Sequence, residues 1–262
     1  VLRASSAVIE NENGKTIGMV SVLSDITKQK ELDRLKSSFI SHVSHELRTP
    51  LVAIEQSISL ILSKTAGPIS RDQEEFLSIS QRNLKRLSHL IDDLLDLSKL
   101  EAGRMDLKRE PLMITKLIDD CVESLRLWAN SKSIDIRVES KGDLPAVSAD
   151  AEKIYQVLNN LLGNAIKFTP SGGYVSIEPA LKKEQGVIEV SVSDNGIGIP
   201  EEALAKIFDK FYQVGDRIAT DLSGTGIGLA IAKEIVELHG GTIRAESRKG
   251  EGAKFIFALP VN

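Results

Sequence analysis

Residues 39–51, with the sequence FISHVSHELRTPL, place two histidines beside acidic, basic and hydroxyl side chains. Apolar residues recur around them at three- and four-residue spacing, which predicts an amphipathic helix. His45 follows Ser41 by four positions and His42 by three, so these three residues would share one helix face. A surface imidazole is a competent nucleophile when an electrophile is brought to it. The alternative is a surface histidine without a chemical role.

A second polar group lies on one face of a helix predicted at residues 151–168. Asn160, Asn164 and Lys167 recur at i, i+4 and i+7, opposite a run of leucines and isoleucines. Asparagine is a mediocre helix former, so its recurrence on one face favours a ligand-binding role. A carboxamide oxygen suits Mg²⁺ that also holds phosphate oxygens, and the lysine adds charge for the same phosphates. A solvated polar face is the alternative.

Two glycine-containing segments are also suited to binding. Residues 193–200, SDNGIGIP, follow a predicted strand, where Asp194 can accept a hydrogen bond from an adenine amino group and the glycines let a ligand approach. An Asp-Asn-Gly turn is the alternative. Residues 224–229, GTGIGL, run into a helix whose N-terminal N–H groups would face an anion. Their spacing matches neither the dinucleotide fingerprint nor the P-loop.

An aromatic segment, residues 207–212 with the sequence IFDKFY, precedes a polar stretch at 213–223 without a clear period. That stretch predicts a mobile loop that closes over a site. An aromatic cluster that serves only the core is the alternative.

The composition limits the classes of function. A chain of 262 residues is about the size of two structural units. Only 4% of the residues are aromatic and the net charge is −4, which argues against binding of nucleic acid. Cys121, the one cysteine, excludes an internal disulfide and indicates a reducing compartment. Because the chain starts at Val1 and has no run of eighteen apolar residues, we expect a cytoplasmic fragment, with membrane attachment only through a missing upstream segment.

The N-terminal part predicts a β-hairpin and then two long helices. Strands at 7–9 and 16–23 flank Asn13-Gly14, a strong hairpin turn, and we expect partner strands upstream because a lone hairpin is unstable. A helical period runs over 25–63, capped by Asp25 or Thr27 and bent at Pro50, and a second helix runs over 71–100. This helical hairpin would bury its apolar stripes by dimerising into a four-helix bundle. A coiled coil without chemistry is the alternative.

After Gly103 the pattern becomes mixed. Strands are predicted at 105–108, 134–140, 174–179, 187–193, 241–247 and 253–259, with helices at 114–131, 151–168, 201–207 and 227–238. This alternation predicts an α/β two-layer sandwich. The whole chain is therefore expected to be α+β, with a helical hairpin followed by this sandwich.

In their order and spacing, these segments resemble a sensor histidine kinase of two-component signalling over about residues 28–262. The His45 segment, HELRTP, is similar to the family's H box, and the stretch from Asn160 to Phe168 is similar to its N box. The G1, F and G2 boxes resemble Asp194 to Gly198, Phe208 to Phe211, and Gly224 to Gly228. The resemblance implies a dimerisation and histidine-phosphotransfer domain at 28–103 and a Bergerat-type ATP-binding domain at 104–262. Residues 1–27 resemble the last strands of a PAS sensor domain.

The same resemblance implies an activity and its residues. His45 would be autophosphorylated from ATP and would pass the phosphoryl group to an aspartate of a response regulator, in a homodimer. Glu46 would handle the imidazole proton, and Glu46 with Thr49 matches the family's E-x-x-T phosphatase pattern. Asn160 would hold Mg²⁺. The implied nucleotide site comprises Asn160, Asn164, Lys167, Phe168, Asp194, Gly196, Gly198, Phe208, Gly224, Thr225, Gly226, Gly228 and Leu229.

One departure from the family pattern bears on the rate of phosphoryl transfer. Gln213 stands where many relatives carry an arginine that steadies the γ-phosphate, and Arg217 is a possible substitute. A scaffold or phosphatase-dominated protein therefore stays open as an alternative, as does a Bergerat-fold ATPase that forms no phosphoenzyme. Whether a protomer phosphorylates itself or its partner depends on the turn at residues 65–70.

Overall fold

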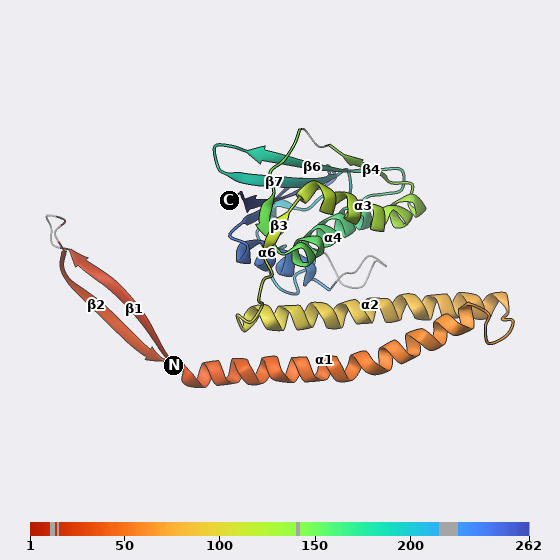
Figure 1. Ribbon diagram of the computed structural model, residues 1–262, viewed down its shortest axis with the longest axis horizontal. Helices are drawn as coiled ribbons and strands as arrows, with labels where there is room; N and C mark the ends of the chain where they lie inside the picture. The colour runs from red at the N-terminus through yellow and green to blue at the C-terminus, as the bar shows by residue number, and fades with distance from the viewer. Residues whose placement is uncertain (11–13, 15, 140–141, 215–224, 262) are drawn as a thin grey trace. The chain divides into compact units, whose positions relative to one another are not determined.

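The computed structural model describes residues 1–10, 14, 16–139, 142–214 and 225–261. They form two compact units, Val1–Met105 and Asp106–Asn262. The first unit holds a β-hairpin and a helical hairpin, and the second holds a sheet with helices (Figure 1). The predicted fold class, a helical hairpin followed by an α/β sandwich, is confirmed.

The β-hairpin consists of β1 (Leu2–Glu10) and β2 (Thr16–Asp25), which pair antiparallel. Gly14 in the connection has a φ of +71°, in the left-handed region that the predicted turn requires. Asn13 of that turn lies outside the described residues. Nearly all described side chains of the two strands are exposed, so the hairpin adds little to the core of its unit.

The helical hairpin consists of α1 (Thr27–Leu62) and α2 (Arg71–Glu101). Pro50 lies inside α1, and the helix bends along its length (Figure 1). Proline has no N–H to donate to the carbonyl of Glu46, which is the usual cause of such a bend. Among the side chains of this hairpin whose burial the structure describes, the buried ones are Ser44, Leu51, Ile58, Ile91, Leu97 and Ser98.

Both long helices begin with side-chain hydrogen bonds. Asp25 accepts hydrogen bonds from the backbone N–H of Thr27 at 2.9 Å and from its hydroxyl at 2.6 Å. At the start of α2, Ser70 and Gln73 form a capping box, in which each side chain accepts from the other residue's backbone N–H. These bonds satisfy N–H groups that a helix cannot pair internally. The N-cap position of α1 is Ile26, which makes no side-chain capping bond, so the predicted cap at Asp25 or Thr27 is wrong. Asp25 lies one residue before that position and bonds to the first helical residue instead.

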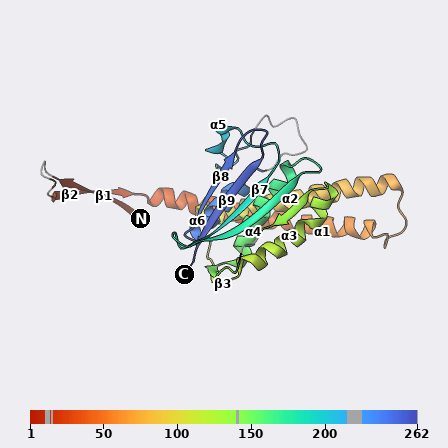
Figure 2. The same cartoon turned by 90° about the horizontal axis from the view of Figure 1, so that it is seen from above.

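The second unit is built on a five-stranded sheet with the strand order β4-β6-β7-β9-β8. Its strands are β4 (Asp135–Val138), β6 (Tyr174–Lys182), β7 (Val187–Asp194), β8 (Thr242–Ser247) and β9 (Ala253–Pro260). β4 runs parallel to β6, and the other neighbours are antiparallel. One face is covered by α3 (Ile114–Ser131), α4 (Ala151–Phe168) and α6 (Gly228–Leu238), as Figures 1 and 2 show. The α-helix predicted at 201–207 is only α5 (Glu201–Leu204).

The predicted strand at residues 105–108 is wrong. The strand in this region is β3 (Glu110–Leu112), which pairs with β5 (Val147–Ala149) in a separate small sheet that the sequence pattern does not predict. The backbone N–H of Lys108 instead donates to the carboxylate of Asp150 at 2.9 Å. A side chain from elsewhere in the chain therefore holds this stretch, and strands of three residues are too short to show a period.

The core of the second unit lies between the sheet and its helices. Large side chains from α3, α4, α6 and β9 are fully buried there, among them Ile118, Leu158, Leu161, Leu162, Ile166, Ile231, Ile235 and Phe257. Cys121 is buried in the same core, and burial raises the pKa of its thiol to about 12. The apolar side of α4 thus faces the sheet, which leaves its opposite side for the asparagines.

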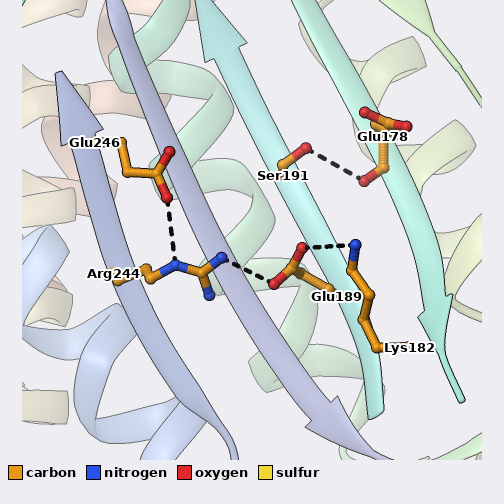
Figure 3. Close-up of polar contacts among 6 residues, drawn as sticks. All are labelled: Glu178, Lys182, Glu189, Ser191, Arg244 and Glu246. Atoms are coloured by element: carbon orange, nitrogen blue, oxygen red, sulfur yellow. Dashed lines mark hydrogen bonds and ion pairs between the residues drawn. The ribbon is translucent and has the colours of Figure 1, made fainter. Parts of the chain in front are cut away.

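The other face of the sheet carries a chain of ion pairs (Figure 3). Arg244 of β8 donates to Glu189 of β7 at 3.0 Å and lies 3.5 Å from Glu246. Glu189 also lies 3.5 Å from the Lys182 ammonium. Ile256 of β9, the register partner of Arg244, is only 2% exposed. The long charged side chains therefore shield the middle strands from water.

Two buried polar residues join the start of α4 to the end of α6. Asp150 caps α4, because its Oδ1 accepts from the backbone N–H of Lys153 at 3.1 Å. The backbone N–H of Asp150 donates to Nε2 of His239 at 3.0 Å, and Nδ1 of His239 lies 2.7 Å from the Ile235 carbonyl. His239 is therefore a neutral imidazole that donates from Nδ1 and accepts at Nε2.

We expect the free energy of unfolding to fall as the pH drops below about 6.5, and His239 to be the cause. Burial lowers the pKa of His239 below its ordinary value of 6.5 in the folded protein, and the nearby Arg109 charge adds to the effect. Between the folded and the unfolded pKa of His239, the unfolded chain binds more protons than the folded protein. The contribution of His239 to the free energy of unfolding is therefore complete above about pH 6.5 and is lost as the pH falls through the folded pKa. Thermal melts from pH 7.5 to 5.0 measure this. His239→Gln should melt lower at pH 7.5 but with a flatter pH dependence, and an unchanged slope would assign the effect elsewhere.

Candidate functional site

His45 lies on the surface of α1. Its side chain is 76% exposed, and its Nδ1 lies 3.9 Å from Oε1 of Glu46, whose side chain is 68% exposed. This distance is longer than a hydrogen bond, and both side chains are largely exposed. The hydroxyl of Thr49 lies 3.5 Å from the backbone carbonyl of His45, one helical turn back. The structure therefore presents the imidazole to solvent with an acid beside it.

His42 and His45 line the same hollow in the first unit. This hollow has a volume of about 580 Å³, and its other lining residues are Ser38, Leu95, Ser98, Lys99, Ala102 and Arg104. They come from the facing sides of α1 and from α2 and its end. One turn away, Arg48 of α1 pairs with Asp92 of α2 across the helical hairpin. The predicted common face of the two histidines is thus observed.

The polar face of α4 carries the predicted asparagines and lysine. Asn160, Asn164 and Lys167 are all half-buried, and the Asn160 amide nitrogen donates to the carbonyl of Gly228 at 3.2 Å. The ammonium of Lys167 lies 4.9 Å from the centre of the Phe168 ring. α4 therefore contacts the start of α6 through Asn160, which joins two of the predicted segments.

Asp194 ends β7 and holds the following loop. Its Oδ1 accepts from the backbone N–H of Gly196 at 2.8 Å and from that of Ala253 in β9 at 3.3 Å. Burial raises the pKa of Asp194, and these two N–H groups oppose that effect. The carboxylate is thus fixed between the loop and β9.

The glycines of this loop are required by close approaches. A Cβ on Gly196 would lie 2.5 Å from the carbonyl oxygen of Phe168, and the N–H of Ile197 donates to that same carbonyl at 3.3 Å. Gly198 has a φ of +66°, and a Cβ there would lie 2.0 Å from the Arg248 carbonyl oxygen. The loop after Asp194 therefore packs against the end of α4 on one side and the β8–β9 turn on the other.

The segment before α6 contacts the aromatic segment. The carbonyl of Gly226 accepts from the N–H of Phe211 at 2.8 Å, and both residues have positive φ. The hydroxyl of Thr225 accepts from the N–H of Ile227 at 3.1 Å. Phe208 packs edge-on against Phe255 of β9, with ring centres 6.4 Å apart.

The structure thus brings together most of the predicted nucleotide-site segments. Asn160 meets Gly228, Phe168 meets the loop at Gly196, and Gly226 meets Phe211. Leu229 is half-buried at the start of α6. Gly224, Arg217 and most of the predicted mobile loop lie outside the described residues, so those expectations stay predictions.

Gly252 is a position that sequence reasoning missed, although its GEG context is typical of a tight turn. Its φ is +84°, and a Cβ would lie 1.9 Å from the backbone carbonyl oxygen of Asp194. Gly250 has a similar φ of +85° but nothing within 4 Å of a Cβ. A comparison of the same substitution at the two glycines therefore distinguishes the cost of backbone strain from the cost of steric overlap.

We expect Gly252→Ala to disturb the Asp194 site far more than Gly250→Ala. Backbone strain alone costs about 1 kcal/mol of unfolding free energy in either variant. In Gly252→Ala, β9 must also move away from Asp194, which breaks its bond to Ala253, so the total loss should reach about 3 kcal/mol. Urea unfolding compares the pair, and equal losses would show that the close approach to Asp194 is unimportant.

Two family patterns match the chain. Residues 35–103 match the His Kinase A (phospho-acceptor) domain, and residues 149–262 match the Histidine kinase-, DNA gyrase B-, and HSP90-like ATPase family. The first match contains α2 and most of α1, and the second contains the sheet of the second unit except β4. The class is therefore a phospho-acceptor helical hairpin joined to an ATPase-type domain.

Known proteins are similar to the chain over most of its length. The sensor histidine kinase WalK of Bacillus subtilis (strain 168) is 37% identical over 260 residues, which are 99% of this chain and 42% of WalK. Full-length ShkA in complex with AMPPNP superposes with a TM-score of 0.70 at 29% identity, over 85% of this chain and 45% of ShkA.

ThkA is similar in two solved structures. Its catalytic domain is 33% identical with a TM-score of 0.51, over 60% of this chain and 96% of that domain. ThkA in complex with the response regulator protein TrrA is 26% identical with a TM-score of 0.60, over 99% of this chain and 75% of ThkA. The chain belongs to the sensor histidine kinase family.

Two further findings concern the share of its relatives that the chain covers and the character of its helices. It spans about two fifths of the length of curated relatives such as WalK. Among the described helices, none combines the length and the apolar character needed to cross a membrane.

Proposed function

We propose that this chain is an ATP-dependent protein histidine kinase that phosphorylates His45 and passes the phosphoryl group to an aspartate of a response regulator. The observation that carries the proposal is an exposed histidine in a phospho-acceptor hairpin, on one chain with an ATPase-type unit. The complex of the relative ThkA with a response regulator supports this class of partner. The parts of the chain are proposed to be a PAS-like remnant at 1–27, a phosphotransfer domain at 28–103 and a catalytic domain at 104–262.

The chemistry assigned to His45 is an in-line displacement. A neutral imidazole nitrogen attacks the γ-phosphorus of ATP, the N–P bond forms as the bond to the β–γ bridging oxygen breaks, and ADP leaves. Because Nδ1 faces Glu46, Nε2 is the nucleophile, and Glu46 accepts or orients the proton on Nδ1. His42 lines the same hollow but has no adjacent acid in the sequence.

The nucleotide is proposed to bind among α4, the loop after Asp194 and the start of α6. Asp194 accepts a hydrogen bond from the adenine amino group, and the backbone around Gly196 and Gly198 allows close approach. Thr225, Gly226 and Gly228 present backbone N–H groups to the phosphates. The remaining contacts are assigned to Asn164, Lys167, Phe168, Phe208, Leu229 and Gly224.

A magnesium ion fits the donor set beside Asn160. The amide nitrogen of Asn160 donates to the Gly228 carbonyl. The amide oxygen of Asn160 is therefore the atom that would bind a cation. Within the described residues, no group of three or more His, Cys, Asp or Glu side chains is placed to hold a metal ion. Such a cation would rely on phosphate oxygens, water and the Asn160 oxygen, which is typical of Mg²⁺ with nucleotides. Its role would be to neutralise the phosphate charge.

Homodimerisation is proposed for the helical hairpin. Large apolar side chains on α1 and α2 remain exposed in the single chain, although the hairpin already buries a seam. A second copy would cover them and complete a four-helix bundle. These residues are Leu32, Leu35, Phe39, Leu47, Val52, Ile54, Leu60, Phe76, Ile79 and Leu87.

A phosphatase activity is the second candidate. Glu46 and Thr49 lie one turn apart on exposed α1, in the E-x-x-T pattern, and Thr49 would position a water against a phosphorylated regulator. Rapid loss of phosphate from the regulator, with autophosphorylation at background, would favour this activity over the kinase.

The fate of the γ-phosphate tests the proposal. With γ-labelled ATP and Mg²⁺, a histidine kinase retains label on the protein in an acid-labile, alkali-stable form. Release of inorganic phosphate without a phosphoprotein would instead indicate a Bergerat-fold ATPase of another kind, and acid-stable label would refute the assignment to histidine.

A further inference from the structure

The end of α4 leaves carbonyl groups that the helix cannot pair. The last four carbonyls of any helix have no intrahelical donor. In α4 the carbonyl of Ala165 accepts from the N–H of Thr169 at 3.0 Å. The carbonyls of residues 166–169 must find their donors elsewhere.

Lys132 supplies three of these donors. It directly follows α3, and its ammonium donates to the carbonyls of Ile166 at 2.6 Å, Lys167 at 3.0 Å and Thr169 at 2.7 Å. An ammonium has three protons, so each is used. Its charge also lies at the negative end of the α4 dipole. Desolvation lowers the pKa of Lys132, and the three bonds offset that cost.

The fourth carbonyl, that of Phe168, holds the Asp194 loop. It accepts from the N–H of Ile197 at 3.3 Å, and Gly196 lies so near that a Cβ would come within 2.5 Å of it. Gly196 in turn donates to Asp194 at 2.8 Å. Contacts therefore run without a break from Lys132 through the last turn of α4 to the Asp194 carboxylate.

The backbone of Lys132 is itself fixed. Its N–H donates to the Ala129 carbonyl at 3.1 Å, and its carbonyl accepts from Gly172 at 3.2 Å, within the turn between α4 and β6. The side chain thus extends from an anchored residue, so it can impose a position on the last turn of α4.

We propose that Lys132 is a positioning residue that holds the last turn of α4 against the Asp194 loop and thereby sets the affinity for the nucleotide. This inference rests on the proposed nucleotide site. Lys132 touches no proposed ligand atom. It acts through the carbonyls at the end of α4, and Phe168 and Lys167 of that turn belong to the proposed site.

The test measures the dissociation constant of ADP by calorimetry at 15 °C, on the whole chain, together with thermal melts. Lys132→Met should weaken binding about tenfold, because the turn loses three hydrogen bonds to a charged donor. Lys132→Arg should weaken binding about threefold, because a planar guanidinium suits parallel acceptors better than three converging ones. Lys183→Met, at an exposed lysine in the β6–β7 turn, makes the same change of charge and should bind as the wild type does.

A double-mutant cycle separates positioning from general stability. Gly196→Ala disturbs the contact between the last turn of α4 and the Asp194 loop from the side of the loop. The loss of ADP affinity in a double variant with either Lys132 substitution should therefore be clearly smaller than the product of the two single losses. The arginine variant keeps the cycle usable if the methionine variant does not fold. Lowered melting with an unchanged ADP affinity, or independent effects in the cycle, would overturn the positioning role. A wild-type chain that fails to bind ADP would overturn the proposed function as well.

Discussion

Substitution of His45 by glutamine is expected to reduce acid-labile phosphate on the protein to background. Glutamine keeps a polar side chain of similar reach but has no nucleophilic ring nitrogen, so no N–P bond can form. The His45 side chain is 76% exposed, so its loss should leave the thermal melt unchanged. ADP affinity should also be unchanged, because the proposed nucleotide site lies in the second unit. Labelling with γ-labelled ATP, followed by acid and alkali treatment, measures the result.

His42→Gln is the matched control for this experiment. His42 lies three residues before His45 and lines the same hollow, so the two variants share surroundings and chemistry. The control should label at close to the wild-type rate. Label that survives His45→Gln but disappears in His42→Gln would identify His42, one helical turn earlier, as the phosphoacceptor.

Asp194→Asn is expected to weaken ADP binding by at least about 100-fold, which corresponds to about 2.8 kcal/mol. The amide can still accept from Gly196 through its oxygen, but its nitrogen is a donor and would face the donor amino group of adenine. Two donors that face each other in a partly buried site leave both unsatisfied. Calorimetric titration of the chain with ADP measures the loss, and GDP serves as the comparison ligand.

The same variant should keep or gain stability at neutral pH. Burial raises the pKa of Asp194 in the folded protein, so its ionised form costs stability above the unfolded pKa of about 3.8. Asparagine removes this cost while it keeps the loop hydrogen bond. A variant that binds ADP normally would contradict the assignment to adenine, and one that loses binding only because it unfolds would show a structural role.

Long periodic segments made most of the fold predictable. The helical period at 25–63 corresponds to α1 at 27–62, and the α4 bounds agree with the predicted 151–168 because an apolar stripe of five turns is a strong signal. The chemistry-bearing residues on α4 and after β7 also stood out, since asparagine repeats in helices and glycines after strands need a local reason. These residues lie in one unit that is built on a single sheet, in which β7 pairs antiparallel with β9.

Contacts made by single residues across long sequence separations were not predictable. Lys132 reaches carbonyls 34 to 37 residues away, and a lysine after a helix has no period to mark it. Asp150 donates its backbone N–H to His239, 89 residues away, and no pattern in the sequence marks that contact. The short pair β3 and β5 depends on the same kind of distant pairing, which explains why residues 105–108 are wrongly predicted as a strand.

The most direct measurement is to locate the phosphoryl group after incubation with ATP and Mg²⁺, by fragmentation mass spectrometry of peptides kept at alkaline pH. The proposed function predicts a single modified residue, His45, in the wild-type chain and strongly reduced modification of His45 in Asp194→Asn, because the nucleotide must bind before transfer. Phosphate on His42, on a hydroxyl or carboxylate side chain, or on His45 of the Asp194 variant at the wild-type level would contradict it.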